Sequence, residues 1–364
     1  MKRRDFLRYA AVLGAAATLG NRTAHAGWLR DDGTTRFPQG MYILDAHGHP
    51  DIYPCTPSFC DTTSTIEKIR QVGMNGSAFA VTEDLSGLQG LLDHCDIVVN
   101  LEDEGRIRII KRYSDLALSR PPYFFSPFRS VPAALFSVEG ATPLGTDVEN
   151  VDLLYRLGVR LITPMHTTTN QFGYVMKYGQ PPDPPLPADL PPPTANGLTE
   201  AGALMIDRMM KRGIIVDSAH AYIATLRGMA EVALRNGVPI IDSHTSLTHR
   251  ENPYGTTRAR TIDEMKIIAS TGGVVCTWPL GHEGRRTFLD WAEETREIAG
   301  EIGINHVGLG TDGGGGLPEL IDGYTSILDL PKLVEAMDQV GFKRSEIAAY
   351  MGGNIARIIR KCIG

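Results

Sequence analysis

Short apolar runs recur along the chain, and most of them end in polar residues. Eight have the length and the β-branched content of buried strands: 41–45, 76–81, 133–138, 159–163, 214–217, 239–242, 273–277 and 306–310. Most of the gaps between them contain apolar residues at helical spacing, most clearly 151–157, 199–212, 223–236, 261–271 and 288–302. Strands that alternate with helices predict a parallel sheet.

Eight such units favour a closed (β/α)8 TIM barrel, an α/β fold whose site lies at the carboxyl ends of the strands. An open, doubly wound sheet is the competing fold. It would require a glycine-rich phosphate loop after the first strand. The residues there are Asp-Ala-His-Gly-His at 45–49, which is not such a loop.

One segment interrupts the alternation between the fourth and fifth units. Residues 181–193 contain eight prolines in thirteen positions. Such a segment forms neither a helix nor a central strand, and its composition is typical of an extended, polyproline-like loop. We expect it on the site side of the barrel, either as a rim or lid or as a passive surface insertion.

The N-terminus has the organisation of an export signal. A basic start that includes Arg3, Arg4, Phe6 and Leu7 is followed by an apolar stretch over 9–19 and by small residues up to Ala26. The apolar stretch is too short to cross a bilayer, and no later run reaches that length. The paired arginines resemble the bacterial twin-arginine signal, with an ordinary secretory signal as the alternative. We therefore expect cleavage after 26, a single barrel domain over 27–364, and a periplasmic location.

Composition narrows the range of partners. The chain is 42% apolar and 21% charged, as globular proteins are. Removal of 1–26 takes away five basic groups and one acidic group, so the net charge changes from −6 to −10. Nothing in this charge suggests nucleic-acid binding.

Five cysteines are present, of which Cys55 and Cys60 are close enough for a local disulfide, with free thiols as the alternative.

Imidazole and carboxylate side chains follow several of the predicted strands. The carboxyl ends of barrel strands share one face, so these side chains should converge, and the combination suits zinc. The residues are His47 and His49 after the first strand, Glu139 after the third, His166 after the fourth, His220 after the fifth, His244 after the sixth and Asp312 after the eighth.

Spacing suggests how these side chains would act. His47 and His49 face the same way in an extended segment, although Asp51 could replace His49 as the second ligand. Glu139 could bridge two metal ions, which together would activate a water molecule. Asp312 precedes four glycines, and a carboxylate beside that water is a natural proton carrier.

An ordered set of motifs accompanies these residues. They are LDAHGH (44–49), SVEGAT (137–142), LYRLGVRLITPMHTTTN (154–170), GLTEAG (197–202), RGIIVDSAHA (212–221), VPIIDSH (238–244), RTIDE (260–264), HVGLGTD (306–312) and GGNIARI (352–358). In this order they resemble the membrane dipeptidase (renal dipeptidase) family of zinc peptidases, over nearly all of the chain that follows the signal. The resemblance implies a (β/α)8 barrel, often a homodimer, in which two Zn²⁺ ions serve the hydrolysis of L,L and L,D dipeptides.

The resemblance also implies a role for each residue. His47 and His49 would bind the first zinc ion, Glu139 would bridge, and His220 and His244 would bind the second. Asp312 would orient the bridging water or hydroxide that attacks the peptide, and would pass its proton to the leaving amine. His166 would bind substrate and stabilise the oxyanion. Arg260 would hold the substrate carboxylate, with Arg250 and Arg258 as alternatives.

Two departures from the family pattern concern specificity. The family has His-x-Asp where this chain has His47-Gly48-His49, and that aspartate helps to hold the free amino group of the substrate. The family's Asp-Phe-Asp-Gly after the eighth strand is Asp312-Gly313-Gly314-Gly315 here. Two alternative functions follow: a related metal-dependent hydrolase of another amide or a lactone, and a catalytically weak periplasmic maturation or binding protein on the same scaffold.

Overall fold

The computed structural model describes residues 37, 41–52, 65–82, 87–119, 131–176, 197–249, 258–317 and 319–364. Three sequence predictions concern residues outside these ranges: the signal over 1–26, the Cys55–Cys60 disulfide and the proline-rich loop over 181–193. Arg250, one of the alternatives for substrate binding, is also outside them.

A parallel sheet forms the centre of the molecule. Its strands run in the order β1 (Leu44–Asp45), β2 (Gly76–Thr82), β4 (Ala133–Glu139), β5 (Leu161–Thr163), β6 (Ile215–Asp217), β7 (Ile240–Thr245), β8 (Val274–Thr277) and β9 (Val307–Leu309). Each overlaps one of the eight predicted runs. A further two-residue strand, β3 (Arg108–Ile109), pairs with β4 and was not predicted.

The first and last strands meet and nearly close the sheet into a barrel. The backbone N–H of Ala46 donates to the carbonyl oxygen of Leu309 at 2.9 Å, and Asp312 N donates to His47 O at 3.0 Å. Gly48 also pairs with Gly313 in a parallel bridge. The seam between β1 and β9 confirms the predicted barrel and excludes the open sheet.

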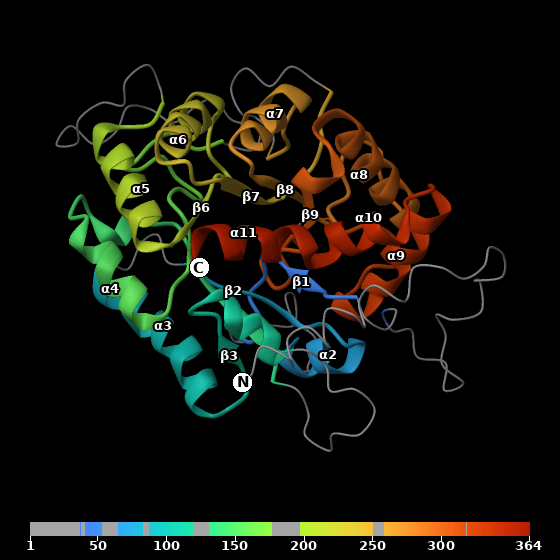
Figure 1. The fold of residues 1–364 in the computed structure, drawn as a ribbon, viewed down its shortest axis with the longest axis horizontal. Coiled ribbons are helices and arrows are strands. Elements are labelled where there is room, and N and C mark those ends of the chain that lie inside the picture. The colour runs from blue at the N-terminus through green and yellow to red at the C-terminus, as the bar shows by residue number, and fades with distance from the viewer. Residues whose placement is uncertain are drawn as a thin grey trace, which may run out of the picture.

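Helices surround the strands (Figure 1). They are α2 (Thr65–Val72), α3 (Gly87–Asp103), α4 (Glu149–Leu157), α5 (Glu200–Arg212), α6 (Ile223–Asn236), α7 (Ile262–Ser270), α8 (Phe288–Ile302), α9 (Leu330–Gln339), α10 (Arg344–Ala348) and α11 (Asn354–Cys362). Helices α4 to α8 match the five predicted stretches to within two residues. None of the helices in the described ranges has both the length and the apolar character that a membrane span needs.

The last helix closes the amino-terminal end of the barrel. In Figure 1, α11 (red) lies across the strands. Its Ile355, Ile358 and Ile359 belong to one buried cluster with Leu135 and Ile215 of the barrel interior. Because apolar side chains seal this end, the buried polar groups are concentrated toward the opposite, carboxyl-terminal end, where the candidate site lies.

Candidate metal centre and active site

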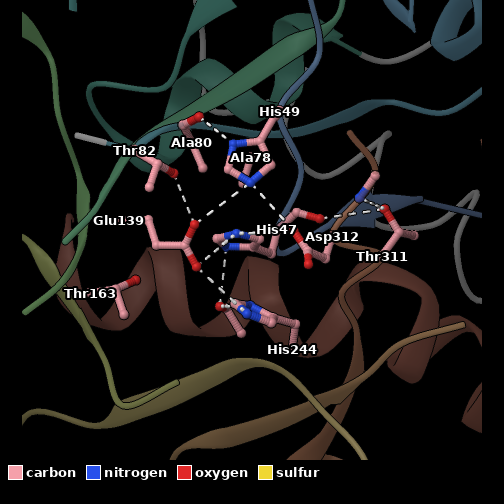
Figure 2. Close-up of polar contacts among 12 residues, drawn as sticks. His47, His49, Ala78, Ala80, Thr82, Glu139, Thr163, His244, Thr311 and Asp312 are labelled. Carbon is pink, nitrogen blue, oxygen red and sulfur yellow. Dashed lines mark hydrogen bonds and ion pairs between the residues drawn. The ribbon is translucent and has the colours of Figure 1, made fainter. Parts of the chain in front are cut away.

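The structure brings the predicted imidazoles and carboxylates together at the carboxyl ends of the strands. Figure 2 shows the side chains of His47, His49, Glu139, His244 and Asp312 pointing toward one centre. These five residues are at most 6% exposed. His220 and His166 complete the cluster from the segments that follow β6 and β5.

Glu139 Oε1 faces three imidazole nitrogens. It lies 3.0 Å from His220 Nε2, 3.4 Å from His47 Nε2 and 3.6 Å from His244 Nε2. The Nε2 atoms of His220 and His244 are 2.9 Å apart. The Nε2 atoms of His220 and His244, together with Glu139 Oε1, form a donor set that could bind a divalent metal ion.

The second oxygen of the same carboxylate faces the other side of the cluster. Glu139 Oε2 accepts a hydrogen bond from Thr82 Oγ1 at 3.0 Å and lies 3.7 Å from His49 Nε2 and 3.8 Å from His166 Nε2. Asp312 Oδ1 is 3.3 Å from the same His49 nitrogen. Glu139 therefore stands between two groups of ligand atoms, as a bridging residue would.

Hydrogen bonds fix which nitrogen carries the proton in the neutral imidazoles of His244 and His47. Ser243 Oγ lies 2.6 Å from Asp217 Oδ2 and donates its only proton there. The same hydroxyl must then accept from His244 Nδ1 at 2.9 Å and from His47 Nδ1 at 3.3 Å. In their neutral forms, both imidazoles consequently carry the proton on Nδ1 and direct an unprotonated Nε2 at the cluster, the form that binds metal. His47 Nε2 is buried and has no hydrogen-bond partner among the described residues.

His49, rather than Asp51, belongs to the cluster. His49 Nδ1 donates to the carbonyl oxygen of Ala80 at 2.7 Å, which leaves Nε2 directed at the other ligands. Asp51 instead accepts from Thr65 N at 2.7 Å and from Arg106 Nη2 at 3.1 Å. The carboxylate of Asp51 is therefore occupied elsewhere.

Two of the cluster residues have backbone conformations that are uncommon for side-chain-bearing residues. His220 has φ 66° and Asp312 has φ 49°, both in the left-handed region that favours glycine. Close approach also limits the loop after Asp312, because a Cβ on Gly315 would lie 1.9 Å from Asp312 Oδ1. That glycine is a steric requirement of the carboxylate position.

Burial and charge determine the protonation of the ligands. Burial lowers the pKa of His220 to about 4 and holds the pKa of His244 well below its usual value, so both imidazoles are neutral at pH 7. Burial alone would also lower the pKa of His47, but the charges of Glu139 and Asp312 outweigh it and raise that pKa to about 9. Burial opposes ionisation of Glu139, yet the nearby His166 and His47 bring its pKa well below the usual range.

Three buried aspartates under the cluster were not predicted from the sequence. They are Asp45, Asp217 and Asp242, each at the carboxyl end of its strand or close to it. Asp45 accepts from Thr311 Oγ1 at 2.6 Å and from Thr311 N at 2.8 Å. A sequence signal for them exists, because each aspartate precedes a cluster histidine by two or three residues.

The structure does not place Arg260 as predicted. Its side chain is fully buried, and its guanidinium donates to Asp242, Ser218 and Ala221, so it is not available to a substrate carboxylate. The alternative, Arg258, is partly exposed and its positive charge lowers the pKa of the cluster histidines 220 and 244. Among the described residues, Arg258 is therefore the predicted alternative whose charge acts on the site.

Comparison with known proteins agrees with this geometry. The model of the membrane dipeptidase family, peptidase family M19, matches residues 129–362, which is more than half of the chain. The chain belongs to the M19 family. A model of the twin-arginine translocation signal also matches residues 1–20 of this M19 protein.

Several relatives and solved structures are similar. Dipeptidase verJ of Clonostachys rogersoniana is 27% identical over 77% of this chain and 67% of its own length. Dipeptidase tcpJ of Claviceps purpurea is 26% identical over 63% of this chain. The chain spans only about half the length of tcpJ, 51%.

Solved structures share the fold at low identity. A metallopeptidase from Rhodobacter sphaeroides, with a bound phosphinate mimic of L-Ala-D-Ala, has a TM-score of 0.71 at 16% identity and covers 88% of this chain and 99% of its own. The probable dipeptidase PvdM from Pseudomonas aeruginosa has a TM-score of 0.69 at 17% identity, over 89% of this chain and 96% of its own.

Membership of a metallopeptidase family implies a bound metal, and the residues of this M19 protein fit one. Three groups of buried or partly buried side chains have ligand atoms within 4.8 Å of one another. They are His47, Glu139 and His244; His47, His49 and Asp312; and Glu139, His166 and His220. Imidazole nitrogens with fixed tautomers and shared carboxylates are the donors that zinc and its neighbours in the first transition row prefer.

Proposed function

We propose that this M19 protein is an exported metallodipeptidase that hydrolyses L,L and L,D dipeptides with two zinc ions. The observation that carries the proposal is the buried convergence of five imidazoles and two carboxylates around Glu139, in a chain of this family. The twin-arginine signal supports export, and we propose the periplasm as the destination and a homodimer as the assembled form.

The donor set divides into two halves at Glu139. His47 and His49 would hold one ion, His220 and His244 would hold the other, and the Glu139 carboxylate, which lies within 4 Å of all four imidazoles, would be shared between them. Two bound ions would supply Lewis acidity, which lowers the pKa of water and polarises the scissile carbonyl. The Ser243 and Ala80 contacts keep three of these imidazoles in the correct tautomer before any ion arrives.

Asp312 is suited to move the proton. Its Oδ1 lies 3.3 Å from His49 Nε2 and 3.8 Å from His47 Nε2, at the edge of the first half of the cluster. In amide hydrolysis the attacking water must lose a proton and the leaving nitrogen must gain one. We propose that Asp312 accepts the proton at Oδ1 and delivers it to the leaving amine.

His166 and Arg258 would bind the substrate. The His166 side chain is 15% exposed, more than the other cluster histidines, and stands edge-on to His220 at a centroid distance of 4.8 Å. A donor there would face the oxygen that becomes negative during attack. Arg258, in place of the predicted Arg260, would hold the C-terminal carboxylate of the dipeptide.

A specific observation favours a second candidate function. His49 places an imidazole, not a carboxylate, in the first half of the cluster. An imidazole does not attract the free ammonium of a dipeptide as a carboxylate would. The second candidate is therefore a metal-dependent hydrolase of amides that lack a free amino group, or of lactones.

The deciding experiment is a substrate panel. The protein without residues 1–26, loaded with zinc, is assayed on free L,L and L,D dipeptides beside N-acetylated copies of each. Turnover of the free dipeptides supports the first function, and preference for the acetylated copies supports the second. His249→Ala, at a side chain that is 59% exposed, is the matched control for loss of a cluster histidine. No turnover of either set with two zinc ions bound would leave hydrolysis of other amides or of lactones, or a binding or maturation role.

A further inference from the structure

The side chain of Arg260 makes an unusual set of contacts for an arginine. It is 0% exposed and is among the largest fully buried side chains. Its three nitrogens bond in three directions: Nε to Asp242 Oδ2 at 2.8 Å, Nη1 to Ala221 O at 2.7 Å, and Nη2 to Ser218 O at 2.7 Å. Nη1 also lies 3.7 Å from Met176 Sδ and 3.9 Å from Glu264 Oε1, so every nitrogen of the guanidinium has at least one partner.

The two carbonyl acceptors flank the strained ligand His220. Ser218 and Ala221 form a turn in which Ala221 N donates to Ser218 O at 3.0 Å. His220 lies inside that turn at φ 66°. A non-glycine residue keeps this conformation only when its surroundings over-determine it. Arg260 bonds the backbone on both sides of the histidine, and Met176 N donates to the carbonyl oxygen of His220 itself at 2.7 Å.

The remaining contacts of Arg260 lead to the other ligand of the same pair. Asp242 lies on β7, two residues before His244. The backbone of Arg260 also pairs with the segment after β7: its N–H donates to Ser246 O at 2.8 Å, and its carbonyl oxygen accepts from Thr248 N at 2.9 Å. Arg260 therefore joins the strand that carries His244 to the turn that carries His220.

We propose that Arg260 is a positioning residue, which fixes the turn of His220 against β7 so that the two imidazoles form a ready pair for one metal ion. The inference rests on the proposed function, since it assigns that pair to metal. It replaces the predicted substrate contact with a structural one. Only arginine suits the task, because three separate acceptors need a planar fork of donors, and the single ammonium of lysine cannot span them.

The test separates geometry from charge. Arg260→Lys keeps a positive charge beside Asp242 but removes the fork. The double variant Arg260→Met with Asp242→Asn removes both charges of the 2.8 Å pair, so that Asp242 is not left as an unpaired buried carboxylate. Glu264, 3.9 Å from Arg260 Nη1, keeps its hydrogen bonds from Thr261. The matched control is Arg160→Lys, because Arg160 is also buried and donates to backbone carbonyls, at 2.9 Å to Tyr155 and Val159, near the opposite end of β5.

Metal-free protein of each variant is titrated with Co²⁺ and followed by visible absorption and calorimetry, beside urea unfolding. We expect wild type to bind two ions. In Arg260→Lys and in the double variant, one of them should bind about 10- to 100-fold more weakly, with altered absorption bands. The other ion should be unaffected. Arg160→Lys should lose stability but keep both affinities and the spectrum.

Each outcome has a definite meaning. If Arg260→Lys and the double variant bind both ions with wild-type affinity and spectrum, the positioning role is overturned while the proposed function stands. If Arg260→Lys does not fold, the double variant gives the decision by the same criterion. A wild-type protein that binds no ion overturns the proposed function and this inference together.

Discussion

The two ends of the barrel are filled in opposite ways by the same strands. Along β4, the interior position of Leu135 is followed two residues later by Ser137 and then by Glu139. Along β6 and β7, the apolar Ile215 and Ile241 are each followed two residues later by a polar residue, Asp217 and Ser243. Successive interior residues lie two positions apart along a strand. An advance of two residues therefore leads from the apolar layer that α11 covers, the floor, to the polar layer.

The comparison shows how one fold separates stability from chemistry. The floor buries aliphatic groups against α11, and this burial stabilises the chain without any polar partner. The opposite end buries acids and imidazoles that stabilise little by themselves and require many hydrogen bonds. Changes at one end should therefore affect function, and changes at the other should affect folding.

The largest effect should follow from removal of a ligand at the polar end. We expect His220→Ala to lower kcat/KM by at least about a thousandfold, because a metal-activated nucleophile is lost. The far-ultraviolet circular dichroism should be unchanged. His249→Ala is the control, and its turnover should match wild type. Full turnover by His220→Ala would remove that histidine from the site.

A change at the apolar floor should give the converse result. Ile358 is 0% exposed and contributes to the floor. Ile358→Ala should lower the free energy of unfolding by about 2–5 kcal/mol through lost burial and a cavity. The metal affinity and the KM of the folded fraction should not change. Leu234→Ala, at a residue that is 57% exposed, should have little effect on unfolding. A floor variant that is stable yet cannot bind metal would contradict the separation of the two ends.

The pH dependence of the free energy of unfolding should also distinguish the polar end of the barrel from the apolar end. Burial lowers the pKa of His220 from 6.5 to about 4, so the unfolded chain binds a proton that the metal-free folded chain does not. The free energy of unfolding is therefore unaffected by this group above pH 6.5 and falls by about 3 kcal/mol as the pH is lowered to 4, because protonation favours the unfolded chain. His220→Ala should therefore flatten the curve of unfolding free energy in this window. Ile358→Ala should shift the curve without a change of slope, and equal slopes for all three proteins would refute the assignment.

A smaller effect is expected from loss of the Ser243 hydroxyl, which lies between Asp217 and the imidazoles of His47 and His244. Ser243→Ala removes the acceptor of both His47 Nδ1 and His244 Nδ1, and should weaken zinc binding by about 10- to 100-fold in calorimetric titration. Ser137→Ala is the matched control. Ser137 Oγ is also buried in the barrel but has no hydrogen-bond partner among the described residues, so its loss should leave zinc affinity intact. Equal affinities in both variants would exclude the hydroxyl from tautomer control.

The smallest effect concerns substrate binding. Arg258→Met should raise KM for dipeptides by about tenfold, since one charge-assisted hydrogen-bonded contact is lost. Dipeptide amides, which lack the carboxylate, should show no such change. Arg285→Met is the control, because Arg285 donates to the carbonyl oxygen of Leu247 and is outside the cluster. An equal rise in KM for acids and amides would exclude a carboxylate contact.

The sequence was sufficient to predict the barrel and the location of the cluster. Strand ends of a parallel barrel share one face, so the positions of His47, Glu139, His220 and His244 after successive strands carried spatial information. The strand β1 also has only two residues, but it lies within an apolar run of strand length, whereas β3 begins at an exposed arginine between two other basic residues, Arg106 and Lys111, and was missed.

Arg260 could not be placed from the sequence, and the reason is physical. An isolated arginine is expected at the surface, because burial of an unpaired charge costs free energy. Its partner Asp242 lies 18 residues away, and its other acceptors are backbone carbonyls of another loop. Only the folded chain brings these groups within reach. The same applies to the contact of Ser243 with His47, which joins residues 196 positions apart in the sequence.

The seam between the first and last strands also constrains the time course of folding. Asp45 and Thr311 are hydrogen-bonded across 266 positions of sequence, and Asp312 joins His47 and His49 there. Contacts so distant along the chain form late, because a long loop must close first. During synthesis the proposed metal-binding cluster therefore stays incomplete until the last strand has emerged. A twin-arginine signal suits such a chain, since that export route accepts proteins that have already folded.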